Sequence, residues 1–208
     1  MYTSCFDYIY ICMCTITSLA DPKSGFIFKF SLMPEKFEKM PEQFNQFDIF
    51  DYANSEHANF KNDLGLFSIA KIAIIGGSGI CALPVICKTP FLYINSWDSF
   101  IFPWSYKLSV FIPTLVKDKN NNKLKIKDII KILRYRPESG PEVFPENDYK
   151  PIEATEEQIL KGYLELEELI KNNNKEWSEN QLRVKSLDEG HLSFLESRIS
   201  DNFIQQNL

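Results

Sequence analysis

The chain has few of the residues that build metal centres. Its 208 residues include two histidines and five cysteines, and Cys12 and Cys14 form a CxC pair without a second pair to complete a zinc site. An odd number of cysteines in apolar surroundings is instead typical of reduced, buried thiols. No Asp-x-Asp motif occurs, so a diphosphate held by a metal ion is not indicated. We therefore expect neither a metal nor a cofactor.

The chain also lacks an excess of positive charge and a long apolar run. Its net charge of -5 argues against a nucleic-acid partner, because proteins that bind nucleic acid carry a basic face. The apolar stretch 5–16 is interrupted by Asp7 and follows no basic residue, unlike a signal peptide or a spanning helix of about 20 apolar residues. We expect a buried strand or a poorly specified leader here, with a membrane anchor as the alternative. The protein is expected to be cytoplasmic, with at most peripheral contact at the inner face of the membrane.

The middle of the chain has the alternating pattern of an α/β domain. Residues 60–71 have helical spacing, 72–76 are continuously apolar, 79–88 are helical again, and 89–95 form a second apolar run. A strand that is apolar at every position is covered on both faces, as parallel strands between helix layers are. Helix, strand, loop, helix and strand in succession predict a doubly wound, Rossmann-like α/β fold with a parallel sheet.

Segments outside this unit carry clear local signals as well. Apolar residues at period two predict a strand in 25–33, and 47–52 reads as a second short strand. Asn59 or Asn62 is a suitable cap for the helix that follows. Thr155 and two glutamates open a helix that runs to Ile170, with Ile159, Tyr163, Leu166 and Ile170 on one face.

These patterns suggest three regions along the chain. Residues 1–45 are expected to be an N-terminal remnant of poorly specified strands and loop. Residues 46–175 are expected to form the Rossmann-like domain, and residues 176–208 a C-terminal helical tail.

The glycine segment between strand and helix is the first candidate binding site. Gly76-Gly77-Ser78-Gly79 would place free backbone N–H groups and a helix N-terminus at the carboxyl edge of the sheet, where phosphates bind in this architecture. Glycine permits positive φ and a close approach of the ligand, and Ser78 adds a hydroxyl. The segment is neither GxGxxG nor a Walker loop. A tight turn that binds nothing is the alternative interpretation.

A polar segment precedes the first helix of this unit and follows the strand at 47–52. It contains Ser55, Glu56, His57 and Asp63. In a doubly wound sheet this segment is expected at the carboxyl edge, beside the glycine segment. His57 could act as a base, although a single loop histidine usually has no such role. Glu56 and Asp63 could position a sugar hydroxyl, while Asp63 is better suited to capping the helix.

The third candidate segment follows the strand at 89–95. Asn95 and Trp97 are expected at the same edge, where an indole ring could stack on a base or sugar, or close the core. Three loops that converge on one edge predict a ligand site more strongly than any one of them.

These residues resemble a known family. The stretch from Phe47 to Leu208 is similar to the C-terminal half of bacterial glycosyltransferases of the two-Rossmann-domain (GT-B) type, associated with surface carbohydrate synthesis. The matching positions are Asp51-Tyr52-Ala53-Asn54-Ser55, Asp63, Ser78-Gly79, Thr89-Pro90, Asn95 and Trp97, with "SVFIPTLVKD", "ATEEQIL" and "ESRISDNFIQQN" further on. The chain departs from the family pattern at Gly76-Gly77 and at Ser96, which splits the Asn-Trp pair.

The resemblance implies a nucleotide-sugar donor site formed by Ser55, Gly77, Ser78, Gly79, Asn95 and Trp97, with Glu56, His57 and Asp63 in support. It also implies transfer to a glycan or lipid-linked acceptor, and a second, N-terminal Rossmann half that carries the catalytic base. No catalytic residue is assigned. The alternative is a non-catalytic, degenerate α/β domain that binds a partner chain. A dinucleotide-dependent reductase is disfavoured, because no acidic residue stands about 20 positions after the loop at a strand end.

Overall fold

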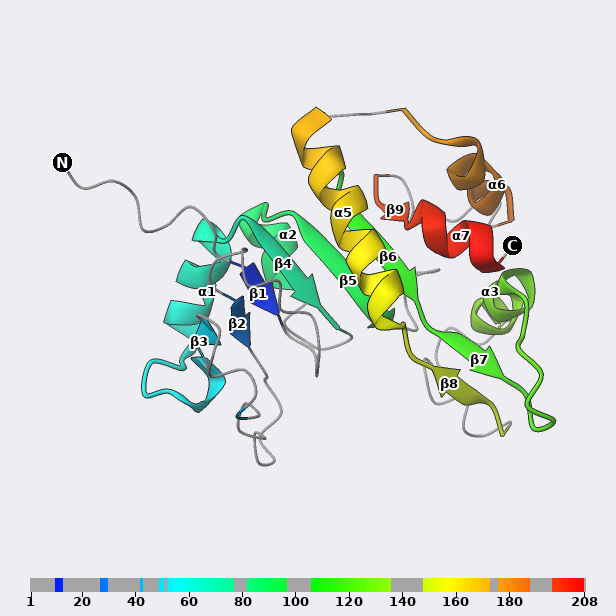
Figure 1. The fold of residues 1–208 in the computed structure, drawn as a ribbon, viewed down its shortest axis with the longest axis horizontal. Coiled ribbons are helices and arrows are strands. Elements are labelled where there is room, and N and C mark those ends of the chain that lie inside the picture. Colours follow the sequence, from blue (N-terminus) through cyan, green and yellow to red (C-terminus); the bar gives the residue numbers. More distant parts are fainter. Residues whose placement is uncertain are drawn as a thin grey trace. The chain divides into compact units, whose positions relative to one another are not determined.

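The computed structural model describes residues 10–12, 27–29, 42, 49–50, 52–76, 82–96, 106–135, 148–172, 176–187 and 196–207 (Figure 1). The chain divides into two compact units, Met1–Phe91 and Leu92–Leu208. The three regions expected from the sequence, with boundaries near residues 45 and 175, stay a prediction.

The first unit contains a four-stranded parallel sheet. Its strands are β1 (Tyr10–Cys12), β2 (Ile27–Lys29), β3 (Ile49–Phe50) and β4 (Ile72–Ile75). They lie in the order β3-β2-β1-β4, and each neighbouring pair is parallel. In β4, the side chains of Ile72, Ala73 and Ile75 are all buried, as expected for a parallel strand covered on both faces. The sequence-based prediction of a mixed α/β fold with a parallel sheet is thus confirmed.

Both helices predicted in this unit are present: α1 begins at the predicted residue, and α2 lies within the predicted range 79–88 but begins at Ala82. The 3-10 turn η2 (Tyr52–Asn54) precedes α1 (Phe60–Ile69), and α2 (Ala82–Cys87) follows β4. Of the two candidate caps, Asn59 is the one used: its side-chain oxygen accepts the N–H of Asn62 at 3.0 Å. Pro84 is the third residue of α2, in the first turn, where proline removes no intrahelical hydrogen bond. α1 and α2 contact each other.

The second unit combines parallel strands with helices and a small antiparallel sheet. Its elements are β5 (Phe91–Ser96), β6 (Ser109–Pro113), β7 (Leu115–Lys117), α3 (Ile126–Tyr135), β8 (Lys150–Ile152), α5 (Glu156–Asn172), α6 (Glu179–Leu187), β9 (Arg198–Ile199) and α7 (Asp201–Asn207). β5, β6 and β9 are neighbours in that order, and β6 pairs with β9 in parallel. β7 and β8 pair antiparallel. The segment expected to be a helical tail therefore also supplies a sheet strand, β9.

Helix α5 is organised around a capping box and a buried face. Thr155 Oγ1 accepts the N–H of Gln158 at 3.3 Å, and Gln158 Oε1 accepts the N–H of Thr155 at 3.0 Å, which confirms the predicted start. The helix packs on β6 and α7. Its buried residues are Ile159, Gly162, Leu166 and Leu169. Tyr163 and Ile170, expected on this face, are half-buried. The residues one position before them, Gly162 and Leu169, are buried instead, so Tyr163 and Ile170 lie at the margin of the buried face.

The longest helix of the described ranges, α5, has 17 residues, of which seven carry charge. A spanning helix needs about 20 mostly apolar residues. Accordingly, none of the described helices is long and apolar enough to cross a membrane.

Gly162 is where α5 lies closest to the strands beneath it. A Cβ at this position would lie 2.9 Å from Ile112 Cδ1 and 3.0 Å from Leu92 Cδ1, whereas a Cβ at Gly65 in α1 would meet nothing within 4 Å. We expect Gly162→Leu to lower the free energy of unfolding by about 1–3 kcal/mol or more. Gly65→Leu, the matched control, should leave it unchanged or raise it by up to about 1 kcal/mol, because leucine is the better helix former. Urea unfolding measures both, and equal effects of the two substitutions would contradict the close packing of α5.

Candidate functional site

The carboxyl edge of the four-stranded sheet is the candidate site of the first unit. Because β3 and β4 run in the same direction, the chain leaves both strands at the same edge. Ile49 of β3 is aligned, through β2 and β1, with Ile72 of β4. The segment with Ser55 follows β3, and Gly76 follows β4. The expectation that both segments leave the sheet at one edge is therefore met.

The two strands are not neighbours, however. β2 and β1 lie between β3 and β4, and three strand spacings correspond to about 14 Å. The expectation that the Ser55 segment emerges beside the glycine segment is wrong in this respect. Local patterns identify strands but not their order, which depends on how the crossovers pass over the sheet.

β4 instead emerges next to β1. Strands β1, β2 and β3 progress to one side of the sheet, and β4 is added on the other side of β1. The direction of progress thus reverses between β1 and β4, and in open α/β sheets such a switch point leaves a crevice at the carboxyl edge. Gly76 follows β4 at this point, and α2 begins at Ala82. Gly77, Ser78 and Gly79, in the connection between them, lie outside the described residues.

The Ser55 segment is a compact turn held by its own polar groups. Ser55 Oγ donates to the carbonyl of Tyr52 at 2.7 Å and accepts the N–H of His57 at 3.3 Å. The carbonyl of His57 accepts the side-chain N–H groups of Asn59 and Asn62 at 3.0 and 2.8 Å. The side chains of Glu56 and His57 are exposed. The Ser55 hydroxyl is thus engaged in shaping the turn, and a role for it in donor binding stays a prediction.

Contrary to the expectation from the sequence, Asp63 does not cap its helix. It is 4% exposed, and its Oδ1 accepts the hydroxyl of Tyr52 at 2.7 Å, while the Tyr52 oxygen accepts the N–H of Asn59 at 3.1 Å. Burial raises the pKa of the Asp63 carboxyl, against the lowering effect of the Tyr52 hydrogen bond. Burial also raises the pKa of Tyr52 to about 12. The hydrogen bond between Tyr52 and Asp63 joins η2 to α1. The N-terminus of α1 is capped by Asn59 instead.

In the second unit, Asn95 is engaged internally. Its backbone has a φ of 52°, a conformation that asparagine tolerates better than most residues. Its side-chain oxygen accepts the N–H of Ala154 at 2.6 Å and so ties the end of β5 to the segment before α5. A donor-binding role of Asn95 stays a prediction, and Trp97 lies outside the described residues.

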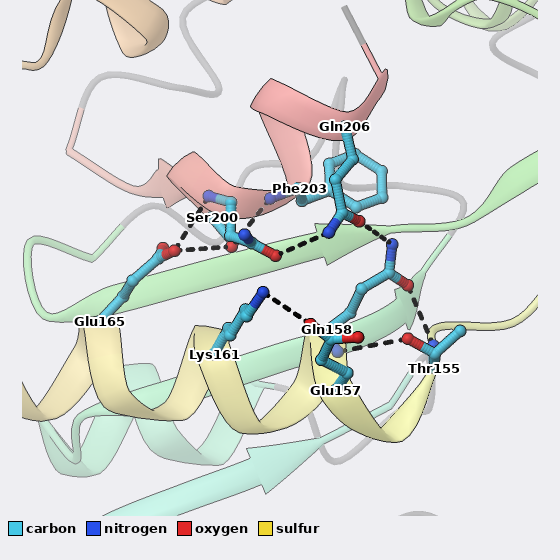
Figure 2. A network of polar contacts seen from close by, with 9 residues as sticks. Thr155, Glu157, Gln158, Lys161, Glu165, Ser200, Phe203 and Gln206 are labelled. Atoms are coloured by element: carbon cyan, nitrogen blue, oxygen red, sulfur yellow. Dashed lines mark hydrogen bonds and ion pairs between the residues drawn. The ribbon is translucent and has the colours of Figure 1, made fainter.

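A polar connection between α5 and α7 is a feature that the sequence reasoning missed (Figure 2). The carboxylate of Glu165 accepts Ser200 Oγ at 3.0 Å and the N–H groups of Asp201 and Asn202 at 2.9 and 3.0 Å. Further along, Gln158 Nε2 donates to Gln206 Oε1 at 3.1 Å. Burial raises the pKa of Glu165, against these donors, which favour the ionised form. Glu165 therefore caps α7 from another helix, a role that no local pattern reveals.

A cavity of about 230 Å³ lies next to this connection. It is lined by Val110, Glu165, Glu168, Leu169, Asn172, Gln181, Arg198, Ile199 and Asp201. The Arg198 guanidinium donates to the carbonyl of Glu176 at 2.7 Å and lies 5.0 Å from the centre of the Trp177 ring. Lys185 Nζ lies 3.3 Å from the same ring centre, and burial, followed by the charge of Arg198, lowers its pKa. Two of the charged residues that line the cavity, Glu165 and Arg198, thus already have partners within the protein.

Comparisons with known proteins add no assignment to this geometry. The chain matches no protein-family model, no curated protein and no solved structure. Within the described ranges, no group of three or more His, Cys, Asp or Glu side chains is arranged to hold a metal ion. Functional inference therefore rests on the sheet edge and the residues that follow its strands.

The Tyr52–Asp63 pair gives a prediction for the first unit. Tyr52→Phe should lower the free energy of unfolding by about 1–3 kcal/mol, because it leaves a buried carboxylate without its hydroxyl donor. Since the folded-state pKa of Tyr52 is raised, the stability it contributes is present below its ordinary value of 10.0 and is lost as the pH rises towards 12. Absorbance at about 295 nm should show one tyrosine that ionises near pH 12 in the wild type and not in the variant. Titration near the ordinary value would contradict the burial of this hydroxyl.

Glu165 gives a prediction for the second unit. Its raised folded-state pKa means that its contribution to stability is greatest below the ordinary value of 4.5 and is lost as the pH rises through the raised pKa. The stability difference between the wild type and Glu165→Gln should therefore shrink as the pH rises from about 4 to 7. Glu168→Gln, which changes an exposed neighbour, should show no such trend. A difference that grows with pH would show that the hydrogen bonds to α7 outweigh the cost of burial.

Proposed function

We propose that the chain binds a nucleotide-sugar donor at the carboxyl edge of the first unit's sheet, as the C-terminal, donor-binding half of a GT-B glycosyltransferase with a doubly wound, Rossmann-like fold. The observation that carries the proposal is the position of Gly76: it follows a buried parallel strand at the reversal of strand order and precedes a helix. Ligands of open α/β sheets bind at such points.

The chemistry of the segment after Gly76 agrees with a diphosphate ligand. Gly77 and Gly79 have no side chain to block an approaching ligand, and Ser78 adds a hydroxyl. The segment precedes α2, and N–H groups at the start of a helix attract anions. In the transfer reaction, such fixed donors would stabilise the negative charge that develops on the leaving diphosphate. The acceptor, a glycan or lipid-linked hydroxyl, needs a general base, which we assign to a second Rossmann half. The setting that fits this chemistry is the cytoplasmic face of the membrane.

Supporting contacts would come from the exposed segment after β3. Glu56 and His57 are exposed, and their turn is fixed by Tyr52, Asn59 and Asn62. Because the strand before this segment, β3, lies about 14 Å from β4, we assign the segment to contacts with the sugar or the base of an extended ligand and not with the diphosphate itself.

Ligand titration tests the proposal. Uridine and guanosine diphosphate sugars and the free diphosphates would be titrated by calorimetry and by thermal shift. At about a hundredfold excess over Kd, binding adds about 2.7 kcal/mol to stability, which raises Tm by several degrees. Gly77→Val should weaken binding at least tenfold, because a β-branched side chain would stand where the phosphate approaches. Gly65→Val, on a helix surface where a Cβ has open space, should leave the affinity unchanged.

No heat and no thermal shift with any of these ligands would contradict the donor site. The competing hypothesis, a non-catalytic domain that binds a partner chain, would then stand.

A further inference from the structure

Positive charge is concentrated in one part of the second unit. Residues 115–131 contain six lysines and two aspartates, a formal charge of +4, in a chain whose net charge is -5. All six lysines are exposed: Lys117, Lys119, Lys123, Lys125, Lys127 and Lys131. The rest of the chain thus has a formal charge of -9, opposite in sign to that of residues 115–131.

Strand pairing brings three lysines into one row. Lys117, the last residue of β7, is paired with Lys150 of β8 and forms an antiparallel bridge with Lys123. Since a strand has two edges, β7 lies between the two partners. Residues directly opposite each other in a sheet point to the same face, so the three side chains form a row, which we call the lysine row.

The spacing within the row is close. Leu124 N–H donates to the carbonyl of Val116 and Asp118 N–H to that of Asn122, both at 2.9 Å. The pair of Lys117 and Lys123, flanked by these bonds, is therefore of the non-hydrogen-bonded type, with Cα atoms about 4.5 Å apart. Like charges placed directly opposite each other are destabilising, so the row costs folding energy rather than adding to it.

Described carboxylates do not compensate this charge. None of the three ammonium groups forms an ion pair with a described carboxylate. Lys123 Nζ donates to the neutral side-chain oxygen of Asn207. The nearest acid in sequence, Asp118, accepts the N–H groups of Asn120 and Asn122 through Oδ1 at 2.8 Å and the Asn122 side chain through Oδ2 at 3.2 Å. Its negative charge is already included in the +4 of residues 115–131.

Helix α3, next to the lysine row, carries two further exposed lysines. It contacts β7 and buries Ile126 and Ile129, while Lys127 and Lys131, four positions apart and so on one face, are exposed. The lysine row and these two side chains together present five ammonium groups on neighbouring elements.

We infer that this surface binds the anionic headgroups of a phospholipid bilayer and holds the protein peripherally at a membrane. Clusters of four to eight basic residues are attracted to anionic lipid, and long, flexible lysines suit a surface of mobile phosphates. Nucleic acid fits less well, because recognition of single strands uses exposed aromatic rings and arginine, and residues 115–131 contain neither. The inference is independent of the donor site.

Vesicle sedimentation tests it. The protein should bind vesicles of phosphatidylcholine with about one third phosphatidylglycerol, and not phosphatidylcholine alone, at low salt. Binding should be lost at about 1 M NaCl, where the screening length falls to about 3 Å. Replacing Lys117, Lys123 and Lys150 by Gln should weaken binding roughly 100-fold, since each lysine near the surface contributes about fivefold.

The control replaces Lys61, Lys107 and Lys171, also exposed, by Gln and gives the same net charge. It should retain binding within about threefold. Because the row is a site of repulsion, the row variant should melt no lower than the wild type, which separates lost binding from lost folding. Equal loss in both variants, no preference for anionic vesicles, or row-dependent binding to a DNA duplex in place of vesicles would overturn the inference.

Discussion

The parallel hydrogen bonding of β4 to β1 is the constraint on which the candidate site of the first unit depends. It aligns Ile72 with Tyr10 and Ala73 with Ile11, and it places the end of β4 at the edge where β3 also ends. Without this pairing, the glycines after Ile75 would be an isolated turn. With it, they follow the strand at which the direction of strand order reverses. This is the position at which ligands of open α/β sheets bind, and on which the proposed donor site depends.

Each unit contains a carboxyl group that is withdrawn from solvent, and different donors hold the two groups. In the first, one carboxylate, Asp63, is held by the hydroxyl of Tyr52, and the pair fixes a turn. In the second, Glu165 uses both oxygens to satisfy the first N–H groups of α7. A short helix such as α7, with seven residues, is unstable by itself. Its position therefore depends on neighbours: Glu165 at one end, Gln158 further along, and the buried side chains of Phe203 and Ile204.

The surface of the second unit shows the opposite arrangement. There, three lysines lie opposite one another on paired segments and form no ion pair with a described carboxylate. Lysines on paired strands repel each other, so this row does not add to stability. The anionic membrane surface proposed above would give these charges a favourable partner.

The sequence by itself determined the elements whose signals are local. Asn59, the Thr155 capping box and the continuous apolar run of β4 are read within a few residues, because caps and periodicity act over one or two turns. Only the tertiary structure decided which strands are neighbours, and therefore that two strands separate β3 from β4. It also decided that Glu165 caps a helix 35 positions away and that Lys117 stands between Lys123 and Lys150. These contacts join residues far apart in the chain, and their partners are set by packing and strand order, which no local pattern encodes.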